Sequence, residues 1–156
     1  MTPGALAWAD AVDLDGNPVA PGPGDAATAR RAWARAQGCR CEQCPLARDA
    51  VPVPSEIKAG ARFLVVGEAP GQHEADEGAP FVGASGRELA AARRACGLDR
   101  GDASLTNAIA CRPPGDWRTY KLRFAKQNAQ RRRDGEPPVA SPVECCAPRL
   151  RREVGE

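Results

Sequence analysis

Phe63-Leu64-Val65-Val66-Gly67-Glu68-Ala69-Pro70-Gly71 is the stretch that decides how this chain folds. Its first four residues are an unbroken apolar run with two β-branched members, which is typical of a buried strand. Gly67 ends that strand, and Pro70-Gly71 is a turn signal. In open α/β sheets ligands bind beyond the carboxyl ends of the strands, so Glu68 stands where a reacting group is expected. Taken alone, the motif fits an ordinary strand exit with a solvated Glu68 equally well.

The sequence downstream predicts a second strand and a helix between the two. Ser85-Gly86-Arg87-Glu88 is a capping-box pattern and predicts a helix that runs to about Cys96, which we expect to be buried, and stops at Gly97. The stretch 103–110 predicts the second strand. Strand, crossover helix and strand form a βαβ unit with parallel strands. Asn107, late in the second strand, is therefore expected to face the same crevice as Glu68.

Composition divides the 156 residues into an extension and one domain, 38–156. Residues 1–37 form an acidic, partly disordered extension with a short helix over 26–37, ended by Gly38. Residues 1–29 contain four acids and no base, and Pro18, Pro21 and Pro23 are expected to break any regular element there. We find neither the roughly 20 apolar residues of a membrane span nor a signal-peptide pattern. The expected location is the cytoplasm, without a membrane partner.

A basic insert over 116–140 is the strongest charge feature of the chain. Its stretch 117–133 holds seven Lys and Arg residues and no acid. A patch of one sign is typical of a nucleic-acid contact, although a solvated charged helix gives the same pattern. The candidate DNA contacts are Arg118, Lys121, Arg123 and Lys126.

Cysteine spacing indicates a metal centre. Seven is an odd number, and in a reducing compartment thiols are more often ligands or buried apolar groups than disulfides. Cys41 and Cys44 form a C-x-x-C pair, and Cys111 and Cys146 lie much further along the chain. Such a site would clip distant segments together, and four thiolates suit zinc and an iron–sulfur cluster equally. Cys39 and Cys145 are rivals for two of the places.

Several of these motifs occur together in one known family. They are, in order, Cys41-x2-Cys44-Pro45-Leu46, Gly67-Glu68-Ala69-Pro70-Gly71, Pro80-Phe81-Val82-Gly83 with Gly86, Thr106-Asn107, Cys111-Arg112-Pro113-Pro114 and Cys146-x3-Leu150. Over about residues 38–153 the chain resembles the iron–sulfur uracil-DNA glycosylases, family 4 of the uracil-DNA glycosylase superfamily. The resemblance implies an α/β domain with a parallel sheet in three layers and a [4Fe–4S] cluster on Cys41, Cys44, Cys111 and Cys146.

The resemblance also implies an activity, which is hydrolysis of the N-glycosidic bond of deoxyuridine in DNA during base excision repair. Uracil must be flipped out of the helix into a pocket. Phe81 would stack on it, Asn107 would pair with its edge, and Glu68 would support bond cleavage. Gly67, Ala69, Gly71 and Glu74 would complete the substrate site.

Two departures from the family affect these expectations. A related branch attaches uracil covalently through an Arg/His loop, but the insert here contains no His, so we do not expect that chemistry. The family continues with further strands and a His-Pro-Ser motif that have no counterpart here. We therefore expect an N-terminal portion whose C-terminal strands are missing: a fragment, a truncated gene product or half of a split protein. The expected state is a monomer, with a separate C-terminal segment as a candidate partner. The alternative function is a truncated, non-catalytic, metal-stapled module that binds DNA or uracil.

Overall fold

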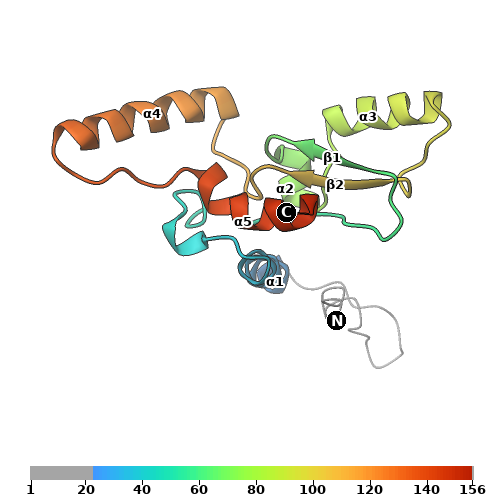
Figure 1. Cartoon of the computed structure of the whole chain (residues 1–156), viewed down its shortest axis with the longest axis horizontal. Helices are drawn as coiled ribbons and strands as arrows, with labels where there is room; N and C mark the ends of the chain where they lie inside the picture. The colour runs from blue at the N-terminus through green and yellow to red at the C-terminus, as the bar shows by residue number, and fades with distance from the viewer. Residues whose placement is uncertain (1–22, 156) are drawn as a thin grey trace.

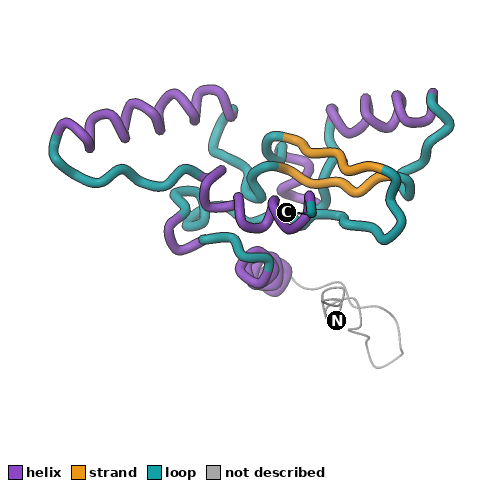
Figure 2. Tube along the Cα trace, in the orientation of Figure 1, coloured by secondary structure: helices purple, strands orange, loops and turns teal. Residues whose placement is uncertain are grey.

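A computed structural model describes residues 23–155, which form helices around a short parallel sheet (Figures 1 and 2). The strands are β1 (Phe63–Gly67) and β2 (Ala103–Asn107). The helices are α1 (Pro23–Ala36), the 3-10 helix η2 (Cys41–Gln43), α2 (Gln72–Glu77), α3 (Ala84–Ala95), α4 (Trp117–Arg133) and α5 (Pro142–Val154). This arrangement is the α/β class expected from the sequence. Of the extension 1–37 that the sequence predicts to be partly disordered, residues 1–22 lie outside the described residues.

The two strands pair in parallel, as the βαβ pattern predicts. Gly67 lies opposite Asn107, so the carboxyl ends of both strands meet at one edge. All five residues of β2 are buried. Its other edge is covered by the segment before β1, where Glu56 and Leu105 exchange both backbone hydrogen bonds at 2.9 and 2.8 Å.

Strand β2 is shorter than predicted, because it ends at Asn107 and not at Ala110. Arg149 of α5 donates to the carbonyl oxygens of Asn107 (2.5 Å) and Ala108 (3.3 Å). A longer strand would offer those oxygens to a neighbouring strand. Asn107 is consequently the last residue of β2 and stands directly at the edge where ligands bind in such sheets.

Helix α1 begins earlier than predicted. Pro23 is its first residue and does not break it, because the fixed φ of proline suits the first helical position, where the N–H has no helical partner. The helix ends at Ala36, just before Gly38, whose φ is 91°. Trp33 and Ala34 belong to the buried core next to the cysteine-rich loop.

Two predictions for α3 are wrong. The helix begins at Ala84 and has no side-chain cap, so Ser85 is not the N-cap of a capping box. The carbonyl of Gly83 already accepts a bond from the N–H of Arg87 (3.0 Å), which starts the helix before Ser85. Cys96 is exposed because it lies beyond the last helical residue, whereas the buried positions of α3 are Gly86 and Arg93.

Helices α4 and α5 differ in how they lie relative to the sheet. Asp116 caps α4 by accepting from the N–H of Thr119 (2.8 Å), and no residue of α4 is buried. In Figure 1 α4 extends away from the sheet, whereas α5 runs beside the strands. Ser141 and Glu144 form a capping box at the start of α5. Within residues 23–155 no helix has the length and apolar character needed to cross a membrane.

Candidate functional site

One cavity of about 680 Å³ opens at the carboxyl ends of both strands. Its lining contains every residue that the sequence places at the substrate: Gly67, Glu68, Ala69, Gly71, Glu74, Phe81 and Asn107. They come from β1, the loop after it, α2, the loop before α3 and the end of β2. The structure thus brings together an acid, an aromatic ring and a carboxamide that are up to 39 residues apart in the sequence.

Gly67 is required by the close approach of two of these side chains. A Cβ at this position would collide with Oδ1 of Asn107 and would lie 3.0 Å from Cζ of Phe81. The carboxamide and the ring therefore converge over the end of β1. A flat polar ring could stack on Phe81 and pair with the donor and the acceptor of Asn107 at the same time.

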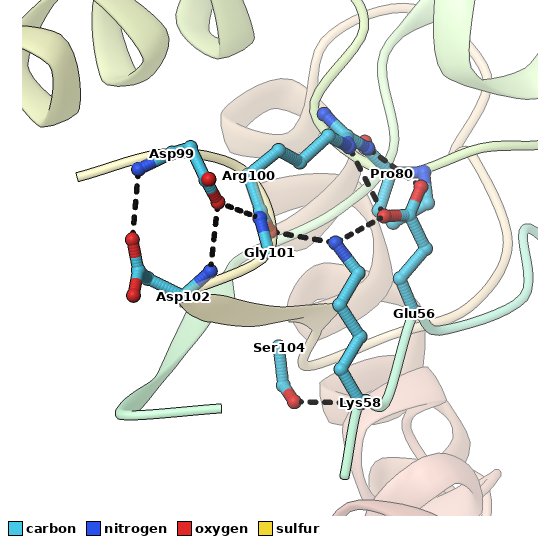
Figure 3. A network of polar contacts seen from close by, with 8 residues as sticks. All are labelled: Glu56, Lys58, Pro80, Asp99, Arg100, Gly101, Asp102 and Ser104. Carbon is cyan, nitrogen blue, oxygen red and sulfur yellow. Dashed lines mark hydrogen bonds and ion pairs between the residues drawn. The ribbon is translucent and has the colours of Figure 1, made fainter. Parts of the chain in front are cut away.

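Phe81 has a φ of 56° and is the only non-glycine residue with positive φ in the described part of the chain. An aromatic residue holds this conformation only where its surroundings impose it. Arg100 forms two bonds to Glu56 (2.6 and 3.1 Å) and donates to the carbonyl oxygen of Pro80 at 2.8 Å (Figure 3). On the other side Gly86 packs so closely that any Cβ there would overlap the carbonyl of Phe81. These contacts fix the backbone on both sides of the ring.

Glu74 holds the loops around the cavity and is only 6% exposed. Its carboxylate accepts the N–H of Gly71 (3.1 Å) and the N–H of Gly83 (2.8 Å). These are the residues that precede α2 and α3. One buried carboxylate therefore fixes the loop after β1 to the start of α3.

Glu68 is exposed and forms an ion pair that the sequence does not reveal. Nζ of Lys121 lies 2.7 Å from its Oε1, and this ammonium lies 5.4 Å from the centre of the Trp117 ring. The hydrogen bond from Lys121 lowers the pKa of the Glu68 carboxyl. Lys121, a candidate DNA contact, thus faces the candidate catalytic acid Glu68.

Sequence reasoning missed Trp117 as a wall of the cavity. Trp117, Tyr120 and Phe124 form a stacked row along α4, with ring centres 5.5 and 6.1 Å apart. Their spacing of three and four residues places them on one helical face, and this signal was readable in the sequence. None of the four candidate DNA contacts lines the cavity, and all of them (Arg118, Lys121, Arg123 and Lys126) are exposed on α4.

Five of the seven cysteines gather in the core that contains Trp33 and Ala34 of α1. Cys39, Cys111 and Cys146 belong to one buried core, with Cys41 and Cys44 packed against it. The N–H of Arg40 bonds to the carbonyl oxygen of Cys145 (2.9 Å), which docks the cysteine-rich loop on α5. Three distant segments therefore bring thiols to one region, as the spacing predicts.

Two observations bear on what these thiols could hold. Burial raises the pKa of the Cys41, Cys44 and Cys111 thiols, and the negative charge of Cys146 raises it further. The pKa of Cys111 rises to about 12. Among residues 23–155 no three His, Cys, Asp or Glu side chains are placed to hold a single metal ion. A four-iron cluster presents a separate iron to each thiolate, so its ligands need not meet at one point. Thiols from three segments on one core are thus a donor set that an iron–sulfur cluster can accept.

Comparison with known proteins gives consistent matches. The family model described as the uracil DNA glycosylase superfamily matches residues 54–155. A type-4 uracil-DNA glycosylase of Pyrobaculum aerophilum is 38% identical over 118 residues, which are 74% of this chain and 50% of that protein. Type-4 uracil-DNA glycosylases of Sulfurisphaera tokodaii and Saccharolobus solfataricus are 41% and 40% identical over 49% of this chain, covering 36% and 37% of their own lengths. The chain spans about half the length, or less, of these relatives.

Proposed function

Because the chain belongs to the uracil DNA glycosylase superfamily, we propose that it releases uracil from DNA by hydrolysing the N-glycosidic bond of deoxyuridine. The convergence of Glu68, Phe81 and Asn107 on one cavity carries this proposal. The abasic site left behind is a substrate for base excision repair.

Each of the three side chains has a role that its surroundings support. Phe81 stacks on the flipped base, because its ring is held at the cavity by backbone contacts on both sides. Asn107 offers a donor and an acceptor to uracil, whose edge is the reverse of that of cytosine. Glu68, whose pKa is lowered by the hydrogen bond from Lys121, stabilises positive charge on the sugar as the bond breaks, or orients the attacking water.

A [4Fe–4S] cluster held by Cys41, Cys44, Cys111 and Cys146 is part of the proposal. Its support is the gathering of these thiols from three segments on one core. The cluster would act as a structural clip, and the hydrolysis needs no electron transfer. Of the two adjacent cysteines we assign Cys146, because it belongs to the same buried core as Cys111, against which Cys41 and Cys44 pack.

The test is uracil release from a single-stranded oligonucleotide that contains one uracil. Glu68→Ala and Asn107→Ala should abolish release, and Glu77→Ala, an exposed acid of α2 outside the cavity, should not. Full activity in either cavity variant would refute the assigned site. DNA binding without release by the parent chain would favour the alternative, a non-catalytic DNA-binding module.

A further inference from the structure

The guanidinium of Arg149 lies beneath the uracil-reading end of β2. Its side chain is 1% exposed, and it comes from α5, one turn after Cys146. It donates to five oxygen atoms: Oγ of Ser55 (3.0 Å), Oγ1 of Thr106 (2.8 Å), Oε2 of Glu153 (2.6 Å) and the carbonyl oxygens of Asn107 (2.5 Å) and Ala108 (3.3 Å). This one side chain therefore ties α5 to the last two residues of β2 and to the residue that follows.

The charge of Arg149 is compensated inside the same cluster. Glu153 is 7% exposed, and its Oε2 also accepts from the hydroxyl of Thr106 at 2.7 Å. A buried ion pair generally adds little stability compared with well-packed apolar side chains of the same volume. Stability alone is thus a weak reason for an ion pair here, whereas buried polar groups specify one conformation in some proteins.

The backbone geometry fixed by Arg149 is that of Asn107. The two carbonyls held by the guanidinium are those of Asn107 and its neighbour, so the strand cannot continue in register. On the opposite side, Oδ1 of Asn107 reaches the space above Gly67, where there is no room for a Cβ. A small rotation of this peptide would move the carboxamide away from the base edge, or into Gly67.

We propose that Arg149 is the positioning residue for Asn107 and that it thereby sets the preference of the cavity for uracil over cytosine. The inference rests on the proposed function, because it concerns how the same cavity reads the base. Arg149 does not line the cavity, so it acts only through the peptide of Asn107.

The test compares single-stranded oligonucleotides that differ only in carrying uracil or cytosine, and it measures binding in a Glu68→Gln background that blocks hydrolysis. Arg149→Lys keeps a charge for Glu153 but cannot bond to both strand-end carbonyls and the hydroxyls. A bidentate amide–base pair typically gives a discrimination of roughly fivefold to hundredfold, and Arg149→Lys should lose most of it. Amide exchange at residues 107–109 should rise in the same variant.

Two further variants keep the test decisive. Arg151→Lys, an exposed arginine of the same helix, should change neither base preference nor exchange. If Arg149→Lys does not fold, Thr106→Val removes one acceptor of the guanidinium within the same shape and should cause a smaller loss in the same direction. Unchanged preference in the folded variant would overturn the inference while leaving the proposed function intact. If Glu68→Gln without any change at Arg149 binds the uracil and cytosine oligonucleotides equally, both the inference and the proposed function are overturned.

Discussion

Nζ of Lys121 lies 2.7 Å from Oε1 of Glu68, so the basic insert reaches the acid at the end of β1. Both side chains are more than half exposed, at 52% and 61%, which leaves the pair open to competition from phosphate oxygens. The ammonium of Lys121 can therefore bond either to the carboxylate of Glu68 or to a phosphate oxygen. The insert is consequently part of the site as well as a candidate DNA contact.

Lys121→Ala should move the acid limb of the pH profile for uracil release to higher pH. Lys121 lowers the pKa of Glu68, so in the parent chain the carboxylate stays ionised as the pH falls. Without the ammonium, the pKa returns toward its ordinary value and Glu68 is protonated earlier. Initial rates measured across the acid range would show the shift. Lys126→Ala, on the same helix but away from Glu68, should leave the limb in place, and an identical limb in both variants would contradict the prediction.

The exposed Lys and Arg side chains of α4 should bind DNA mainly through its phosphate charges. Arg123→Ala and Lys126→Ala should each weaken binding to any single-stranded sequence and lower the slope of log affinity against log salt by about 0.7. Titrations at several salt concentrations measure this slope. Arg94→Ala on α3, outside the insert, is the control. A slope that stays the same in the α4 variants would assign the insert to another partner.

Glu74→Gln should destabilise the fold by about 1–3 kcal/mol, because a neutral amide has one acceptor oxygen for the two N–H groups that Glu74 now serves. Glu77→Gln on the same helix is exposed and should change stability little. Urea unfolding of both variants makes the comparison. Equal stability of the two would mean that Gly71 and Gly83 find other acceptors.

Strand ends and glycine turns are local signals, and they predicted the parallel strands with Glu68 and Asn107 at one edge, whereas Phe81 and Glu74 were expected in the site from the family resemblance. The sequence did not predict the ion pair of Lys121 with Glu68, since the partners are 53 residues apart and nothing local marks the contact. Nor did it predict the short β2, whose end is set by Arg149 from a distant helix. The failed capping box at Ser85 has the same origin, because Gly83 and its tertiary contact with Glu74 decide where α3 starts.

Cysteine variants should identify the fourth ligand of the proposed cluster. Cys111→Ser and Cys146→Ser should lose bound iron and the broad visible absorption of cysteine-ligated iron, together with much of the stability, because the clip between segments is gone. Cys96→Ser is the control, since that thiol is exposed. Cys145→Ser should keep its iron. The iron and sulfide content of each purified variant is the measurement. If Cys145→Ser loses its iron and Cys146→Ser keeps it, Cys145 is the fourth ligand and Cys146 is not.

Gly86→Ala should damage the cavity from a residue that does not line it. The added methyl would overlap the carbonyl of Phe81, so either α3 shifts or Phe81 leaves its φ of 56°. Loss of base stacking on an aromatic ring generally weakens binding by roughly 1–3 kcal/mol. We expect weaker binding of a uracil-containing single strand by about that amount, measured by anisotropy, as in Phe81→Ala. Ala91→Ser, an exposed change of similar size on α3, should bind normally. Parent-like affinity in Gly86→Ala would show that the Phe81 loop adapts and that its backbone does not need to be held.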